Sequence, residues 1–227
     1  MSNHNPEDNL HPDDRINRDD GRKYWETVEA DVNGMLGGIP LVEGFSNISR
    51  IDLQGSRSFL AKLGIGKQQG RRIVGSALEG GAGVGRITEG LLLEVAEQVD
   101  VVEPIAKFTA SLRGKAGVRN VHNVGLEEWQ PADDIRYDLV WTQWCKATLN
   151  PDGVIVLKEN ISTSGKDLFD DEDSSVTRQV EDTKFQSLFQ EAGLRLVKAE
   201  IQKGFPKTAE MTLYPIKMYA LKPRAGP

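Results

Sequence analysis

The chain lacks the features that mark secreted, membrane and nucleic-acid-binding proteins. Its only cysteine, Cys145, excludes an internal disulfide and fits a reducing compartment. No apolar run approaches the length of a membrane span, and the chain starts without a signal-peptide core. The net charge of -6 provides no basic surface for nucleic acid. We therefore expect a cytoplasmic or nuclear protein that binds neither membrane nor nucleic acid.

Histidine is also scarce, which limits the candidate bases. His4 and His11 lie in residues 1–21, a polar segment with almost no apolar side chains, and we expect this tail to be disordered. His122 lies in a run that predicts a strand, where a structural role is commoner than a catalytic one. No cluster of residues suggests a metal site.

Glycine, in contrast, is concentrated at one predicted strand-to-helix turn. An apolar run at 73–79 predicts a buried parallel strand, and residues 85–97 repeat apolar side chains at helical spacing. Between them lie Gly81, Gly83 and Gly85. Backbone N–H groups and the helix dipole face a ligand at such a turn, and glycine lets that ligand approach the main chain. A glycine-rich turn without a ligand is the alternative.

The spacing of these glycines argues against a dinucleotide. The G-x-G-x-x-G fingerprint needs a third small residue, but Arg86 takes that position when the pattern starts at Gly81. The next predicted strand, residues 99–103, ends in Glu103, whose carboxylate can accept both hydroxyls of a ribose. Together these features favour an adenosine-ribose site. The G-x-G-x-G form after the acidic Glu79 resembles motif I of the S-adenosylmethionine (SAM)-dependent methyltransferases.

Strands and helices alternate over the rest of the chain, which is typical of a doubly wound parallel sheet. Two helices, at 24–32 and 52–63, are expected before the glycine loop. The last two strands are expected as an antiparallel pair at one edge. The full pattern predicts strands at 73–79, 99–103, 118–124, 137–143, 154–158, 194–201 and 217–221, and further helices at 85–97, 105–113 and 176–192.

One connection is short for this pattern. Residues 137–143 and 153–158 predict consecutive parallel strands, and only residues 144–152 join them. A parallel crossover normally takes about a dozen residues or more, usually with a helix. We therefore expect no covering helix at this point and a sheet face that is partly bare.

Several segments, in order, resemble the eukaryotic alpha N-terminal protein methyltransferases. This family methylates the α-amino group of proteins that begin Xaa-Pro-Lys (Ala, Pro or Ser at the first position) after removal of the initiator Met. The resemblance covers roughly residues 22–222, and its D-D-x-D-S-S-V-x-R stretch is more specific than the glycine loop. The matching segments are Tyr24-Trp25, Gly34-Met35-Leu36-Gly37-Gly38, residues 77–88, residues 141–144, Lys158-Glu159-Asn160 and residues 170–178.

The resemblance implies an α/β fold of the Rossmann-like class I methyltransferase type. Its core would be a doubly wound, seven-stranded, mostly parallel sheet with an N-terminal helical extension. The disordered tail would be followed by the extension and a gating hairpin at 22–70 and by the SAM-dependent domain at 71–227.

The resemblance also implies roles for individual residues. Asp173 would accept the proton of the α-amino group, and Asn160 would hydrogen-bond the end of the peptide. Residues implied to contact SAM are Gly81, Gly83, Gly85, Arg86, Glu103, Pro104, Ile105, Leu126, Glu127 and Gln143. Residues implied to bind the peptide are Leu36 and Gly37 of the gating hairpin, Trp144, Asp170 and Ser175.

These residue types suit the implied chemistry. An α-amino group has a pKa of about 8, so a carboxylate such as Asp173 need only accept a proton that leaves readily. The indole of Trp144 offers a π-face to an ammonium. The acidic residues 170–173 suit a peptide with a positive amine and a Lys, and such binding should be sensitive to salt.

Each of these features also has a simpler interpretation. In that interpretation the acidic run serves only as the cap of a helix starting at Val176, and Trp144 is a core aromatic. After the W-x-Q-W pattern the family continues with a Gly-His pair and a helix, but here Cys145 follows Trp144 and no histidine matches. The alternatives are therefore a catalytically impaired homologue that binds SAM or a peptide, and a small-molecule methyltransferase.

Overall fold

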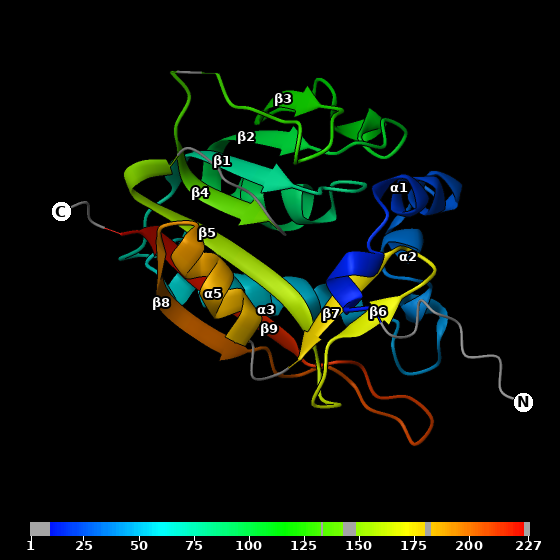
Figure 1. The fold of residues 1–227 in the computed structure, drawn as a ribbon. Coiled ribbons are helices and arrows are strands. Elements are labelled where there is room, and N and C mark those ends of the chain that lie inside the picture. The colour runs from blue at the N-terminus through cyan, green and yellow to red at the C-terminus, as the bar shows by residue number, and fades with distance from the viewer. Residues whose placement is uncertain (1–9, 133, 143–148, 180–182, 225–227) are drawn as a thin grey trace, which may run out of the picture.

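The computed structural model describes residues 10–132, 134–142, 149–179 and 183–224 (Figure 1). Its centre is a parallel sheet in the order β3-β2-β1-β4-β5. An antiparallel pair extends this sheet, with β9 hydrogen-bonded to β5 and β8 to β9. These seven strands confirm the expected fold class. Their bounds are β1 Val74–Gly80, β2 Ala96–Val102, β3 Val118–His122, β4 Tyr137–Thr142, β5 Leu149–Ser162, β8 Leu194–Ile201 and β9 Ile216–Pro223.

Two further strands form a hairpin that the sequence did not predict. β6 (Leu168–Asp170) pairs antiparallel with β7 (Ser175–Gln179), and β7 runs parallel to the last residues of β5. The predicted helix at 176–192 is therefore wrong in its first part, and the helix is α5 (Thr183–Glu191). The β-branched Val176 and Thr177 fit a pleated strand, where Val176 pairs with Phe169 of β6.

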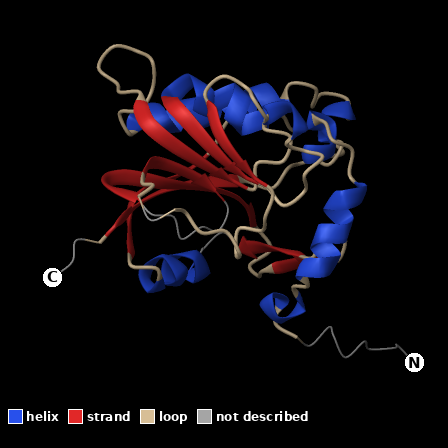
Figure 2. Cartoon of the chain, turned by 90° about the horizontal axis from the view of Figure 1, so that it is seen from above, coloured by secondary structure: helices blue, strands red, loops and turns tan. Residues whose placement is uncertain are grey.

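Helices cover both faces of the sheet (Figure 2). The 15-residue helix α3 (Ile48–Lys62) packs on one face with a π-helical turn (η4, Thr88–Leu92) and α4 (Leu93–Val95). On the other face Phe185 and Phe189 of α5 pack against Tyr219. No helix among the described residues is long and apolar enough to span a membrane.

Two predicted helices are shorter than expected. The helix at 85–97 ends early because Ala96 already pairs with Val74 in the sheet, so β2 begins there. In place of the helix at 105–113 there are turns and one 3-10 turn, η5 (Ala110–Leu112). Its apolar pattern still indicates burial correctly, since Phe108 and Leu112 are almost fully buried.

The N-terminal segment contains short helical elements, the first of which begins at Pro12. A 3-10 turn (η2, Pro12–Arg15) precedes α1 (Arg18–Thr27), whose first N–H groups donate to the side chain of Asn17. The expectation of disorder is therefore wrong for residues 10–21, while residues 1–9 lie outside the described residues. The helix expected at 24–32 is likewise displaced toward the N-terminus. Two short elements follow, α2 (Val32–Met35) and η3 (Ile39–Leu41).

The connection between β4 and β5 lies outside the described residues over 143–148. The two strands pair in parallel as expected. Val140 and Ile155, on the face that carries α5, are almost fully buried in a cluster with Trp129 and Phe185. The expectation of a partly bare face is therefore wrong at these positions, because α5 and the segment after β3 cover them.

Candidate active site

The glycine loop directly follows β1 and adopts backbone angles that favour glycine. Gly81, Gly83 and Gly85 all have positive φ, at 69°, 53° and 79°. A Cβ atom at Gly83 would stand 2.4 Å from Met35 Sδ, whereas no atom lies within 4 Å of a Cβ at Gly81. The loop therefore has one position closed by Met35 and one open position next to the end of β1.

Glu103 ties this loop to the end of β2. Its Oε2 accepts a hydrogen bond from Gly83 N at 2.9 Å, and its Oε1 accepts one from Ile105 N at 2.9 Å. The side chain is buried, and burial raises the pKa of its carboxyl. Pro104 lies between Glu103 and Ile105, so these three residues form one short segment against the loop. The carboxyl group is thus fixed in place against the loop at Gly83.

A second buried acid supports the loop from β1. Thr88 Oγ1 donates to Glu79 Oε2, and Glu79 is almost fully buried. Burial raises the pKa of Glu79 to about 8, against the opposing effects of Thr88 and Arg86. Glu79 is therefore protonated near neutral pH and joins the start of the first helical turn to the sheet.

The side chain of Arg86 faces α3. Arg86 Nη1 lies 2.9 Å from Asp52 Oδ2, and Lys158 Nζ from β5 contacts Asp52 Oδ1 and donates to Ser56 Oγ at 2.9 Å. Asp52 and Lys158 were not predicted from the sequence as site residues. The signal was available, since Asp52 and Ser56 lie four residues apart and share one face of a helix whose other inward residues are apolar.

The expected gating hairpin lies over the glycine loop. Leu36 and Gly37 directly follow Met35, whose sulfur packs against Gly83. Asp31 begins α2 by accepting a hydrogen bond from Gly34 N at 2.7 Å. Leu36 is half-buried and Gly37 is exposed. Leu36 and Gly37 thus directly follow the residue that closes the loop at Gly83.

The acidic residues form the turn of the β6–β7 hairpin. Asp170 pairs with Ser175 across the hairpin. Asp170 Oδ1 accepts from Glu172 N at 2.9 Å, and Asp173 Oδ1 accepts from Ser175 N at 3.1 Å. Ser174 has a positive φ of 55°, which closes the turn. The alternative of a helix cap is therefore wrong, because a strand and not a helix follows Ser174.

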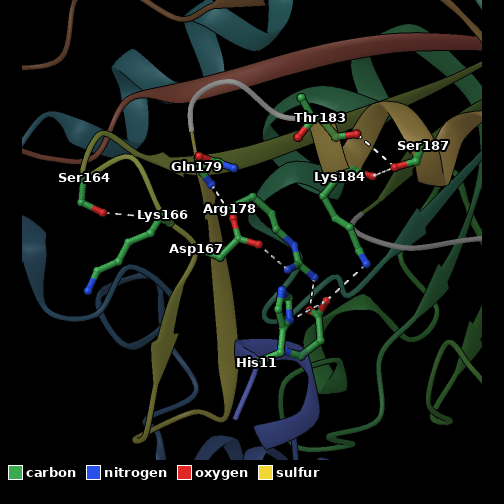
Figure 3. A network of polar contacts seen from close by, with 10 residues as sticks. His11, Ser164, Lys166, Asp167, Arg178, Gln179, Thr183, Lys184 and Ser187 are labelled. Atoms are coloured by element: carbon green, nitrogen blue, oxygen red, sulfur yellow. Dashed lines mark hydrogen bonds and ion pairs between the residues drawn. The ribbon is translucent and has the colours of Figure 1, made fainter. Parts of the chain in front are cut away.

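Residues 11–17, which we call the strap, bind this hairpin (Figure 3). Arg178 is almost fully buried; it donates to Asp167 Oδ2 at 2.8 Å and to Asp13 of the strap. Arg15 donates to Asp171 Oδ1 at 2.6 Å, and the backbone N–H of Asn17 donates to Ser174 Oγ. The hairpin is thus held by residues more than a hundred positions away in the sequence.

Helix α1 (Figure 1) lies against the acidic turn at one end, where a Cβ at Gly21 would stand 2.8 Å from the carbonyl oxygen of Asp173. Tyr24 faces the acidic turn, since its pKa is raised by burial and then by the negative charges of Asp173, Glu172 and Asp170. Beyond the other end of α1, Lys107 Nζ donates to the carbonyl of Val28 at 2.7 Å. Lys107 follows the segment that carries Glu103. The acidic turn and the segment after Glu103 therefore both contact the region of α1.

The remaining predicted site residues have no described contact with the glycine loop or the acidic turn. Asn160 is exposed near the end of β5, beside Ile161, which pairs with Arg178 of β7. Leu126 packs on the core cluster around Trp129, and Glu127 Oε1 lies 3.8 Å from Arg18 of α1. Gln143 and Trp144 lie outside the described residues.

Known proteins resemble the chain over most of its length. The family model described as "AdoMet dependent proline di-methyltransferase" matches residues 13–222. Alpha N-terminal protein methyltransferase 1 of Schizosaccharomyces pombe is 40% identical and covers 91% of this chain and 96% of its own length. N-terminal Xaa-Pro-Lys N-methyltransferase 1 of Danio rerio is 36% identical, and the match covers 88% of this chain and 92% of that protein.

A solved structure agrees with these relatives. A SAM-dependent methyltransferase of Leishmania major has a TM-score of 0.74 and 34% identity, and the match covers 90% of this chain and 82% of that one. The fold and the cofactor expected from the sequence, a class I methyltransferase fold and SAM, are therefore confirmed. The chain belongs to the AdoMet-dependent proline di-methyltransferase family.

Proposed function

We propose that this protein transfers methyl groups from SAM to the α-amino group of proteins that begin Xaa-Pro-Lys. The observation that carries the proposal is the acidic turn of the β6–β7 hairpin, which is bound by the strap and faces Tyr24 of α1. The names of the relatives in Schizosaccharomyces pombe and Danio rerio support the same reaction.

The glycine loop fits the cofactor of the family. The space at Gly81 admits a ligand to the main chain, and the Glu103 carboxyl group stands where ribose hydroxyls can donate to it. We assign SAM binding to the loop, Arg86 and the segment from Glu103 to Ile105, with Leu126 and Glu127 beside the adenine. When bound, SAM supplies an electrophilic methyl group on a sulfonium.

The acidic turn supplies the proton acceptor and the charge. The attacking amine must present a free lone pair, and an α-amino group with a pKa of about 8 is partly deprotonated near neutrality. Asp173 accepts the proton that the amine releases, while Asn160 hydrogen-bonds the end of the peptide. Asp170 and Ser175 bind the Pro-Lys portion, and the negative charge of the turn attracts the Lys side chain.

Asp173 performs this step without a histidine partner in our proposal. His11 belongs to the strap and accepts from Asp13 N, and the ring of His122 lies 5.9 Å from that of Trp129. Neither contact involves the acidic turn. Asp173 is therefore the residue on which proton removal depends.

A direct test combines binding with mass spectrometry. Isothermal titration with SAM is followed by incubation with Ser-Pro-Lys and Pro-Pro-Lys peptides, and each peptide is expected to gain methyl mass. The matched control is the same peptide with an acetylated α-amino group, which keeps its Lys and should gain nothing. Methylation of the acetylated peptide would point to Lys as the target. Tight SAM binding without any mass gain would reject the proposal, and peptide binding under those conditions would identify a binding module.

A further inference from the structure

A cavity of about 550 Å³ lies between α3, α4 and the loop that leads into β1, and we call it the α3 cavity. This loop precedes β1, whereas the glycine loop follows β1, so the two loops lie at opposite ends of one strand. The described residues that line the α3 cavity include none of those predicted to bind SAM or the peptide. The α3 cavity is therefore separate from the candidate active site.

The charged lining of the α3 cavity is mainly positive. Arg57 and Lys62 of α3 line it together with Lys67 and Arg71 of the loop. Among the described residues of the lining, Glu94 of α4 is the one carboxylate. The whole chain has a net charge of -6, so this concentration of cations is a local feature and does not follow from the composition.

Two of the four cations are already paired. Arg57 Nε lies 2.8 Å from Glu94 Oε2, and the same guanidinium donates to the carbonyl of Gly90 in η4. Lys62 Nζ lies 2.8 Å from Glu200 Oε2. These two side chains therefore form fixed walls of the cavity.

The other two cations remain available to a ligand. The side chains of Lys67 and Arg71 make no hydrogen bond or ion pair with the rest of the described chain. Lys67 is nevertheless near the wall, because its charge adds to that of Arg57 in lowering the pKa of Glu94. Two positive groups thus lie at the α3 cavity without an anion of their own.

The loop holds these cations in a closed backbone. Gly66 N donates to the carbonyl of Arg72 at 3.0 Å, and Arg72 N donates to that of Gly64 at 2.9 Å. Gly66 has a φ of 151°, and a Cβ there would stand 3.2 Å from Arg71 Cδ. The stem of Arg71 therefore packs on a glycine, while the buried side chain of Ile65 fixes the start of the loop.

We propose that the α3 cavity binds a polyphosphate group, with Lys67 and Arg71 as its main contacts. A guanidinium matches phosphate oxygens with two parallel hydrogen bonds, and an ammonium adds a mobile point charge. The volume lies within the range of small-molecule sites, roughly 300–1,000 Å³. A polyphosphate also carries several negative charges, as the excess of cations requires. The group belongs either to a free inorganic polyphosphate or to a nucleotide.

Isothermal titration of the unaltered protein distinguishes these two sources. The cofactor site is first filled with S-adenosylhomocysteine, so that the adenosine of ATP cannot enter it. Tripolyphosphate and ATP are then titrated without Mg²⁺ at one ionic strength, and we expect at least one dissociation constant below about 1 mM. Tighter binding of ATP would identify a nucleotide, and equal or weaker binding of ATP an inorganic polyphosphate. Failure of both to bind would overturn the proposal.

The double variant Lys67→Met and Arg71→Met locates the binding. We expect at least about tenfold weaker binding of the preferred probe, because two charge-assisted contacts are lost. SAM affinity should be unchanged, since the glycine loop is at the other end of β1. The matched control is Arg50→Met with Arg195→Met, which removes the same charge from two exposed positions outside the cavity. Equal losses in the two proteins would show general charge attraction and overturn the proposal.

Glu94→Gln provides an independent variant with an effect of opposite sign. It removes the carboxylate that repels a phosphate, while its amide oxygen can still accept from Arg57. The affinity for the preferred probe should therefore increase several-fold. An unchanged or lower affinity would overturn the proposal even if the double variant fails to fold.

Discussion

Two carboxylates mark the two halves of the site, and they are held in different ways. Glu103, on the cofactor side, is only 6% exposed and is bonded by N–H groups from the adjacent loop and segment. Asp173, on the substrate side, is half-buried in a turn whose shape depends on the strap. The cofactor half is therefore built from neighbouring strand ends, and the substrate half from ion pairs between distant segments.

This difference predicts how the halves respond to change. Groups fixed by the sheet should be insensitive to the N-terminal residues, whereas the acidic turn should lose its alignment when the strap is weakened. Peptide binding and SAM binding should therefore be separable by substitution.

The largest expected effect is on the substrate half. Asp173→Asn removes the proton acceptor, and we expect the turnover number to fall at least about a hundredfold, as for loss of a general base. The SAM dissociation constant should be unchanged because Glu103 and the glycine loop are untouched. Steady-state kinetics and isothermal titration check both values. A comparable loss of SAM affinity would show that the halves are not separate.

A pH effect is expected on the cofactor half. Burial raises the pKa of Glu79 from its ordinary 4.5 to about 8, so the folded protein binds the proton more tightly than the unfolded chain. The free energy of unfolding should therefore fall as pH rises from 4.5 to 8, by at most about 1.4 kcal/mol per pH unit for one group. Denaturant unfolding across this range measures the slope.

Glu79→Gln should flatten this slope because glutamine does not titrate. Its amide oxygen can still accept the hydrogen bond from Thr88, so the packing is kept. Burial also raises the pKa of Glu159, next to Asn160, to about 8, so Glu159→Gln is a matched comparison. Each variant should remove part of the pH dependence. Unfolding free energies that stay parallel to those of the unaltered chain at every pH would contradict the assignment.

A smaller effect is expected from the strap. Asp13→Asn leaves Arg178 with Asp167 as its remaining carboxylate partner among the contacts described, and the hairpin should become less well aligned. We expect the KM for the peptide to rise about five- to tenfold, with unchanged SAM affinity. Arg22→Ala is the control, since its exposed pair with Glu26 lies on α1, just after the strap. Equal peptide KM values for the two variants would show that the strap does not contribute to the substrate site.

The smallest effect is expected where α1 meets the cofactor side. Lys107→Met removes hydrogen bonds to the carbonyls of Glu26 and Val28 from an exposed side chain. Such bonds contribute little, so the KM for the peptide should rise only about twofold. An effect as large as that of Asp13→Asn would mean that α1 is held mainly from this end.

The cofactor half could be predicted from the sequence because its signals are local. Gly81 and Glu103 directly follow β1 and β2, and the carboxyl ends of neighbouring parallel strands meet at one edge. The spacing of residues along the chain therefore determines their proximity. Arg86 was identified as well, but its buried partner Asp52 was missed because it comes from another element, as was Lys158, which also pairs with Asp52.

The substrate half was predicted in part. The acidic residues were identified from the family resemblance, yet the strand at Ser175–Gln179 was interpreted as a helix, since a few apolar residues fit either period. The strap was expected to be disordered because it is polar. Its order comes from pairs such as Asp13 with Arg178, and nothing in the local sequence predicts a partner so far away.

Strand β5 sets the spacing between the two halves of the site. Lys158 and Asn160 are two positions apart on it, so they project to the same face about 7 Å from each other. Lys158 pairs with Asp52, which also contacts Arg86 at the end of the glycine loop, and Asn160 belongs to the anchor proposed for the acceptor's first residue. The separation of donor and acceptor would thus be set by the pitch of a single backbone, and a slip of one residue in that strand would turn both side chains away together.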